Sequence, residues 1–217
     1  MSTSSPAPFD RLIAGYRRFR SDAWESRRQR WESLRDGQTP ETLVIACSDS
    51  RVDPAQIFDV DPGEIFVVRN VAALVPPFET TPGHHGVSAA LEFAVQFLKV
   101  KEILVMGHGR CGGCKAALTR EMHGLEMGEG GFVANWIAML DDVRGPIAHQ
   151  HGVDGRAAEQ EMEKAAVKVS LANLRSFPCI RHKEAKGDLV LRGAIFAISD
   201  GVLHVLDEKT GTFGSVD

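Results

Sequence analysis

The sequence lacks three features that would each assign the protein to a particular class. Its 217 residues contain no apolar run long enough to span a membrane, so we expect no membrane partner. The formal net charge is −4, and a chain without an excess of basic residues gives no reason to expect nucleic acid as a partner. Residues 1–8 have neither the basic nor the apolar segment of a secretory signal, and we expect a disordered tail there.

Cysteine is scarce as well. The four cysteines are too few for a disulfide scaffold in a chain of this length: Cys47, Cys111, Cys114 and Cys179. Because no secretory signal is visible, we expect a reducing compartment and a cytoplasmic location. Cysteines in such a compartment favour metal binding or catalysis over cystine bridges.

Short apolar runs alternate with helical patterns along most of the chain. Strands are expected at 42–46, 65–68, 103–106, 189–198 and 202–206, and helices at 54–58, 85–98, 112–123, 132–143 and 155–174. The Asp200-Gly201 dipeptide predicts a hairpin turn between the last two strands, and residues 209–211 are expected to end the ordered part. This alternation predicts an α/β fold whose central, mostly parallel sheet has an antiparallel edge and is flanked by helices.

Residues 9–36 are charged and follow a helical pattern. Their apolar side chains form one stripe, to which Leu12, Ile13, Tyr16 and Phe19 belong. Such a helical arm has too little apolar surface to fold alone, so it must pack on the domain or on a second subunit. No internal linker or repeat is visible, and we predict one domain over residues 9–217 with this N-terminal arm.

Two of the predicted strands end in residues that can bind a metal. Cys47 follows the strand at 42–46, and His108 and Cys111 follow the strand at 103–106. In open α/β sheets, ligands bind beyond the carboxyl ends of the strands. Two thiolates and one imidazole are a known ligand set for catalytic zinc and leave a fourth position for water or substrate. Spacing alone does not join Cys47 to the other two residues.

Other interpretations of these residues stay open. Each cysteine could be a small buried apolar side chain, and His108 could be a core histidine. Cys111 and Cys114 form a C-x-x-C motif at a helix start, which is the position of a thiol redox pair. A closed structural zinc site could use Cys114 as a fourth ligand. Cys179 follows a proline in an apolar context, and we expect it to be structural.

Asp49 and Arg51 follow Cys47 at the same strand end. A carboxylate beside a metal can ligate it, accept a hydrogen bond from bound water, or act as a base. An arginine paired to that carboxylate would hold it in place and favour its charged form. A structural zinc site has no need of such a pair, although the pair could also be a salt bridge that only stabilises the turn.

Several motifs of the sequence resemble, in order and in spacing, those of the β-class carbonic anhydrases. They lie at 46–52 (ACSDSRV), 62–64 (PGE), 68–72 (VRNVA) and 108–113 (HGRCGG), and the resemblance runs from about residue 9 to the final hairpin. The resemblance implies one Zn²⁺ per subunit, held by Cys47, His108 and Cys111. It implies reversible hydration of carbon dioxide to bicarbonate and a proton by zinc-bound hydroxide. Asp49, oriented by Arg51, would accept a hydrogen bond from that hydroxide.

The resemblance also implies a small pocket for carbon dioxide, some of it supplied by a neighbouring subunit. The family's pocket positions fall on Gln38, Phe66, Val71 and Gly112. The family fold implies a homodimer or a higher homo-oligomer in which the N-terminal helices, residues 9–36, pack on the partner. His84 stands where relatives often carry a tyrosine, so it is a polar pocket residue, a proton carrier or simply an exposed residue.

Two positions bear on the fourth zinc ligand. One subtype of the family closes its site with the aspartate of the pair and has a tryptophan where this chain has Val44. Gln38 is present here, as in the other subtype, whose site stays open. We therefore expect water or a small anion, and not Asp49, as the fourth ligand.

Two alternative functions stay open. One is a non-enzymatic relative that binds zinc or bicarbonate, and the other is a thiol redox protein that uses Cys111 and Cys114. All five residues of the metal site and the adjacent pair are present, and this favours the enzyme. A binder without activity would be free to lose Asp49 and Arg51.

Overall fold

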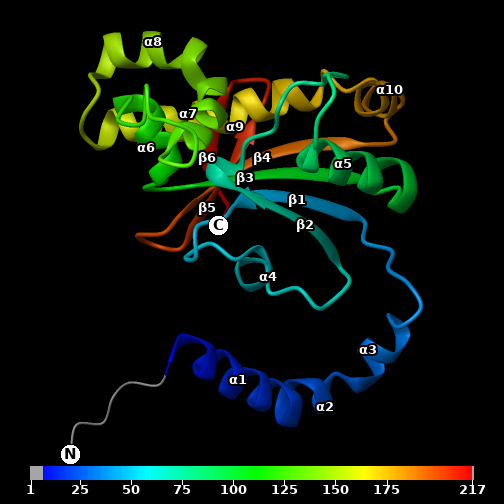
Figure 1. Cartoon of the computed structure of the whole chain (residues 1–217). Helices are drawn as coiled ribbons and strands as arrows, with labels where there is room; N and C mark the ends of the chain where they lie inside the picture. The colour runs from blue at the N-terminus through cyan, green and yellow to red at the C-terminus, as the bar shows by residue number, and fades with distance from the viewer. Residues whose placement is uncertain (1–6, 217) are drawn as a thin grey trace, which may run out of the picture. The chain divides into compact units, whose positions relative to one another are not determined.

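The computed structural model describes residues 7–216, and Figure 1 traces the whole chain. Most of the tail predicted over residues 1–8 lies outside the described residues, and helix α1 begins at Pro8. The chain divides into two compact units at Gln38–Thr39. The single domain predicted over residues 9–217 stays a prediction.

The first unit is helical, as its sequence pattern predicts. Its elements are α1 (Pro8–Arg18), the π-helical segment η1 (Phe19–Ala23), α2 (Trp24–Ser26) and α3 (Arg28–Ser33). Trp24 stacks on Trp31 with ring centroids 5.4 Å apart, and Phe19 meets Trp31 edge-on at 6.1 Å. Leu12 and Tyr16 of the apolar stripe are exposed to 68% and 59%.

The second unit is a six-stranded sheet covered by helices (Figure 1). Its strands are β1 (Thr42–Cys47), β2 (Ile65–Asn70), β3 (Glu102–His108), β4 (Val190–Ala197), β5 (Val202–Asp207) and β6 (Thr212–Ser215). The order is β2-β1-β3-β4-β5-β6, in which β2, β1, β3 and β4 run parallel while β5 and β6 pair antiparallel. This confirms the predicted fold class, a mostly parallel sheet with an antiparallel edge.

The register of the parallel strands places the metal-binding residues at one end of the sheet. Ala46 of β1 pairs with Met106 of β3, and Cys47 pairs with Asn70 of β2. Parallel strands end on the same side, so the loops after β1, β2 and β3 meet there. Strand β3 itself ends at His108.

Helices and helical turns connect the strands. They are α4 (Pro54–Ile57), η2 (Val71–Ala73), α5 (Gly86–Glu92), η3 (Phe93–Leu98), α6 (Gly112–Thr119), α7 (Gly131–Ile137), η4 (Ala138–Leu140), α8 (Asp141–His151), α9 (Arg156–Leu174) and α10 (Pro178–Lys186). The predicted start of α4 is confirmed, since Asp53 accepts a hydrogen bond from the Ala55 N–H at 2.9 Å. Within residues 7–216, no helix combines the length and the apolar character that crossing a membrane requires.

Two predictions about element boundaries are wrong. The ordered part does not end at residues 209–211, because Gly211, at a φ of +71°, turns the chain into β6. That strand has four residues and one large apolar side chain, so it leaves no strand pattern in the sequence. The helix predicted over 132–143 is interrupted by η4, and α8 then continues to His151 with Pro146 inside it.

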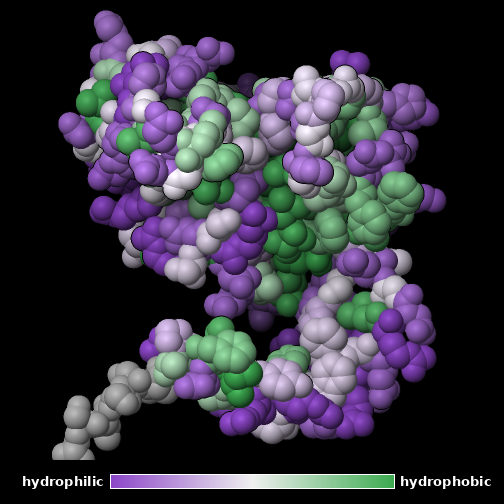
Figure 2. All heavy atoms as spheres, in the orientation of Figure 1, coloured by the Kyte–Doolittle hydropathy of each residue, from purple (hydrophilic) through white to green (hydrophobic). Residues whose placement is uncertain are grey.

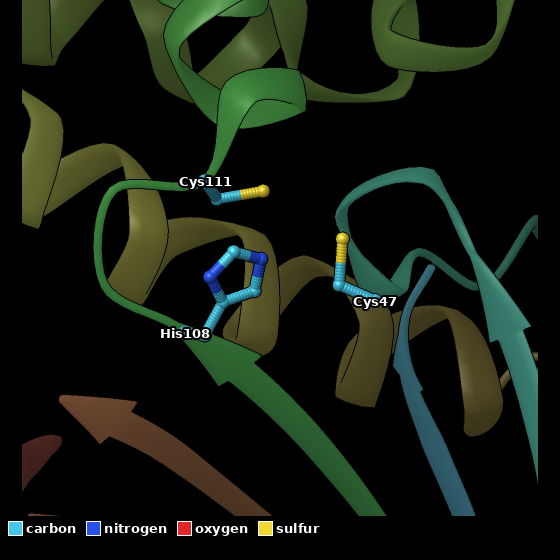
Figure 3. A group of neighbouring side chains, drawn as sticks. All are labelled: Cys47, His108 and Cys111. Atoms are coloured by element: carbon cyan, nitrogen blue, oxygen red, sulfur yellow. The ribbon is translucent and has the colours of Figure 1, made fainter. Parts of the chain in front are cut away.

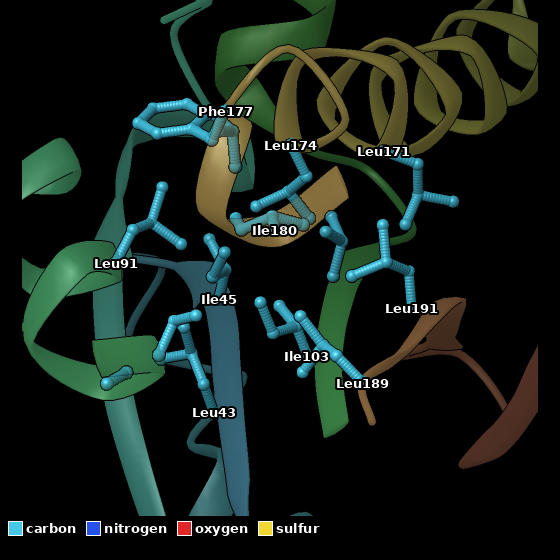
Figure 4. Packing of buried hydrophobic residues seen from close by; sticks show 14 of the residues in the cluster. Leu43, Ile45, Leu91, Ile103, Leu171, Leu174, Phe177, Ile180, Leu189 and Leu191 are labelled. Atoms are coloured by element: carbon cyan, nitrogen blue, oxygen red, sulfur yellow. The ribbon is translucent and has the colours of Figure 1, made fainter. Parts of the chain in front are cut away.

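The hydrophobic core of the second unit lies between the parallel strands and the helices that cover them (Figure 4). Its buried members include Leu43, Ile45, Leu91, Ile103, Leu171, Leu174, Ile180 and Leu189. Helix α9 packs closely on the sheet, because a Cβ atom on Gly107 or Gly193 would come within 2.8 Å of Val167. Glycine at these two positions therefore fixes α9 against β3 and β4.

Candidate metal centre

Cys47, His108 and Cys111 converge on one point, as Figure 3 shows. One ligand atom from each lies within 4.8 Å of the other two, and all three side chains are buried. Cys47 is the last residue of β1, His108 is the last residue of β3, and Cys111 directly precedes α6. Cys47 is far from His108 and Cys111 in the sequence, and the parallel register of β1 and β3 brings it next to them.

The two ring nitrogens of His108 have different surroundings. Nδ1 lies 3.0 Å from the carbonyl oxygen of Gly109, and since a carbonyl only accepts, Nδ1 carries the proton. Nε2 is buried and has no hydrogen-bond partner among the described residues. A lone pair left free beside two cysteine sulfurs is what a metal ligand requires.

The electrostatics of the two cysteines favour a bound cation. The adjoining Cys111 sulfur and burial raise the pKa of Cys47 to about 12, and the neighbouring Cys114 raises the pKa of Cys111 to about 12. Burial opposes a charge on His108, but Cys47, the Gly109 carbonyl and Asp49 together place the pKa of His108 above its ordinary value. With pKa values this high, both cysteines are thiols at neutral pH unless a cation is bound, because two thiolates this close need a positive charge between them. The donor set and its surroundings therefore fit zinc, which binds two cysteines and one histidine in catalytic sites.

The Asp49 carboxylate lies beside these ligands and is held by Arg51. Nε of Arg51 donates to Oδ1 at 2.9 Å, Nη2 donates to Oδ2 at 2.7 Å, and the Arg51 backbone N–H donates to Oδ1 at 3.0 Å. Oδ2 lies 3.9 Å from Nε2 of His108. These bonds hold the pKa of Asp49 well below its ordinary value, so the carboxylate is ionised at neutral pH.

Arg69 supports the same loop, a role that the sequence analysis did not predict. Its Nε donates to the carbonyl of Cys47 at 2.9 Å, and its Nη2 donates to the carbonyl of Asp49 at 2.7 Å. Arg69 pairs with Ala46 in the register of β1 and β2, which puts it next to the strand end that carries the site. Its place in the 68–72 motif, at the end of the strand predicted at 65–68, was the available signal.

Two of the four predicted pocket residues lie next to the metal ligands. Gly112 is the first residue of α6 and directly follows Cys111. Val71 packs on the same turn, because a Cβ atom on Gly113 would come within 2.7 Å of it. The Val71 carbonyl also accepts a hydrogen bond from Nε1 of Trp136 at 2.9 Å.

Val71 belongs to the wall of a groove of about 520 Å³. Its lining is largely apolar and includes Phe132 and Trp136. His84 also lies in this wall and its side chain is exposed, so its possible roles stay predictions. Val71, a predicted pocket residue, and His84 therefore line the same groove.

The other two predicted pocket residues lie elsewhere. Phe66 pairs with Leu43 in β1, whereas the strand end pairs Cys47 with Asn70. Four residues of strand separate these levels, or about 13 Å, so Phe66 does not adjoin the metal ligands of its own chain. Gln38 belongs to the first unit. The roles of both in the pocket stay predictions.

The remaining cysteines take no part in the cluster. Cys114 is buried on the first turn of α6, and its sulfur is not one of the three gathered ligand atoms. The closed four-ligand site is therefore not formed. All four cysteines are free thiols, and Cys111 belongs to the cluster of three ligand atoms.

Known proteins resemble this chain over nearly its whole length. The family model described as carbonic anhydrase matches residues 42–203. Beta carbonic anhydrase 3 of Arabidopsis thaliana is 38% identical over 205 residues, which cover 93% of this chain and 78% of that protein. The structure of the β-carbonic anhydrase CcaA superposes with a TM-score of 0.88 at 32% identity, covering 96% of this chain and 99% of that one. One of the tetrameric β-carbonic anhydrases of Sordaria macrospora gives a TM-score of 0.79 at 29% identity, over 93% of this chain and 98% of that one.

Proposed function

Because the chain belongs to the carbonic anhydrase family and to its β class, it catalyses the reversible hydration of carbon dioxide, and we propose that Asp49 and Arg51 orient the attacking nucleophile. Cys47, His108 and Cys111 are the residues that would hold the zinc ion. When bound, the zinc ion supplies the positive charge that lowers the pKa of a water ligand toward about 7.

The proposal rests on the position of the Asp49 carboxylate, which lies beside His108 and accepts two side-chain hydrogen bonds from Arg51. An ionised carboxylate accepts hydrogen bonds and cannot donate them. Asp49 therefore takes the hydrogen bond of the attacking hydroxide and leaves a lone pair of its oxygen directed at carbon dioxide. Arg51 keeps Asp49 charged and fixes the direction of that bond.

We place carbon dioxide beside Val71 and Gly112, because Val71 both lines the apolar groove and packs on the first turn of α6. An apolar wall suits this substrate because carbon dioxide has no charge and no hydrogen to donate. Phe66 lies too far along β2 to reach the ligands of its own chain. We therefore assign Phe66 and Gln38 to the pocket of a neighbouring subunit.

The fourth zinc position, in this proposal, stays open to water or a small anion. Arg51 engages both carboxylate oxygens of Asp49, so Asp49 would have to break this pairing to reach the metal. Val44 is buried inside the sheet with Ala46 and Met106, and so offers no surface for a bound anion there. Both features support the open subtype.

We also propose a homo-oligomer in which residues 9–36 pack on a partner subunit. Exposed apolar side chains on α1 support this assembly, since Leu12 and Tyr16 are exposed to solvent. Figure 2 shows further hydrophobic side chains gathered over β2 and the helical segment η3. Phe93 and Phe97 of η3 are exposed. The Sordaria macrospora relatives are tetrameric. A cytoplasmic location stays a prediction, and the four free thiols support it.

The variant Asp49→Asn tests the role of the carboxylate. Asparagine keeps the shape but can donate a hydrogen bond and carries no charge, so we expect carbon dioxide hydration in a stopped-flow assay to fall by at least about 100-fold at equal zinc content. Asp141→Asn removes a carboxylate of the ion pair with Arg120, away from the metal, and should keep the wild-type rate. Wild-type hydration by zinc-loaded Asp49→Asn would exclude the proposed role.

A further inference from the structure

The turn that joins His108 to Cys111 is held at one residue, Arg110. Its φ of +56° is left-handed, a conformation that is strained for a residue with a side chain. The Arg110 N–H donates to Oε1 of Glu163 at 2.6 Å, and the Arg110 carbonyl accepts from Nη2 of Arg51 at 3.2 Å. Both backbone groups of this residue are thus engaged by side chains, one of which belongs to the pair beside the metal.

Glu163 is a buried carboxylate on α9, with 3% of its surface exposed. Arg156 neutralises it through two hydrogen bonds, Nη1 to Oε1 at 2.7 Å and Nη2 to Oε2 at 2.9 Å. A buried carboxylate without such a partner would strongly destabilise the folded protein. A Cβ atom on Gly109 would lie 3.3 Å from Nη2 of Arg156, so glycine leaves room for the guanidinium at this turn.

Helix α9 gives Glu163 a fixed place relative to β3. Val167, one turn further along the helix, packs on Gly107, where a Cβ atom would come within 2.8 Å. Met162 and Ala166 on the same helix are buried as well. The carboxylate therefore cannot follow a movement of the turn unless the packing of α9 on the sheet changes too.

We propose that Glu163, neutralised by Arg156, is a positioning residue for the metal centre. By accepting the Arg110 N–H it holds the left-handed turn, and the turn sets the distance between the two metal ligands that flank it. Through the Arg110 carbonyl it also fixes Arg51. Glu163 touches neither the metal nor the substrate. The proposal rests on the zinc site and not on turnover, so zinc affinity tests it separately from the role of Asp49.

Glu163→Met and Glu163→Gln separate this hydrogen bond from the ion pair. Both remove the charge and keep the length of the side chain, but only glutamine keeps an oxygen that can accept the Arg110 N–H. Removing a group that supports metal ligands typically weakens metal binding by about 10- to 100-fold, so we expect at least about tenfold weaker zinc binding for Met and less than about threefold for Gln. Competition with a chromophoric chelator measures the affinity. The visible spectrum of the cobalt-substituted protein should change for Met and not for Gln.

The matched control is Glu184→Met, which breaks the hydrogen bonds that Arg175 makes to Glu184 at the other end of α9. It should leave zinc affinity and the cobalt spectrum unchanged. Equal zinc affinities of Glu163→Met and Glu163→Gln would overturn the proposal. If Glu163→Met does not fold, Glu163→Asp decides, because its shorter side chain cannot reach both Arg156 and Arg110. Wild-type zinc affinity of Glu163→Asp would likewise overturn the proposal.

Discussion

Arg51 occupies both carboxylate oxygens of Asp49, and this arrangement limits what Asp49 can do beside the metal. The carboxylate stays charged, because its pKa lies below the ordinary value. The pairing is therefore present above the ordinary carboxyl pKa and is lost only when the pH falls through the lowered pKa. Across the neutral range Asp49 is an acceptor with a fixed direction, which suits orientation of a nucleophile better than proton transfer.

If the fourth zinc position is open, Asp49 is not a zinc ligand, and X-ray absorption can test this. Zinc K-edge X-ray absorption at neutral pH should show two sulfur ligands, one imidazole and one light atom without the outer scattering of a carboxylate. The spectrum of Asp49→Asn should be the same, since Asp49 contributes no ligand. Because the pKa of Asp49 is lowered, lowering the pH to about 5 should leave the wild-type spectrum unchanged. A carboxylate signal that disappears in Asp49→Asn would show that Asp49 closes the site.

Single residues also show where sequence reasoning stops. The three ligands and the Asp49–Arg51 pair were found because they stand in short motifs. Glu163 had no such signal, because the Arg110 it supports lies 53 positions earlier in the chain. The only hint in the sequence was that Glu163 stands among apolar residues on one face of its helix, which the structure buries.

Among the elements, the strands that carry the site were predictable because a strand buried on both faces reads as a continuous apolar run. The burial of β1 from Leu43 to Cys47 is an example. Helix α10 was missed because it begins at Pro178, and a proline that starts a helix looks the same in sequence as one that ends the previous helix. The pairing of β6 depends on β5, and four residues cannot show it alone.

Helix α1 carries the prediction about assembly. Replacing exposed Leu12 and Tyr16 together by Glu should weaken self-association by at least about 100-fold, since each apolar side chain buried in an interface contributes about 1.5–3 kcal/mol. Sedimentation equilibrium measures the change. Arg17→Glu adds an acidic residue to the same helix outside the apolar stripe and should associate as the wild type does. A monomeric wild type, or a double variant with unchanged association, would contradict the proposed role of the arm.

In the molecule as a whole, the site is assembled from distant parts of the chain. One ligand comes from β1, two come from β3 and the turn after it, and the support for that turn comes from α9. The sheet register brings the ligands together, and close packing on Gly107 and Gly193 brings α9 to them. Sequence periodicity predicts each strand and helix separately. Which face of a helix contacts which strands is decided by packing across the whole second unit.

This assembled site works through zinc, so removing and returning the metal is the decisive experiment. Carbon dioxide hydration should be followed by stopped flow on one preparation with zinc, after zinc is removed by a chelator, and after zinc is returned. We predict that hydration falls to the buffer rate in the zinc-free protein and recovers fully at one zinc ion per chain. Hydration that persists without zinc, or that stays at the buffer rate after one zinc per chain has bound again, would contradict the claim.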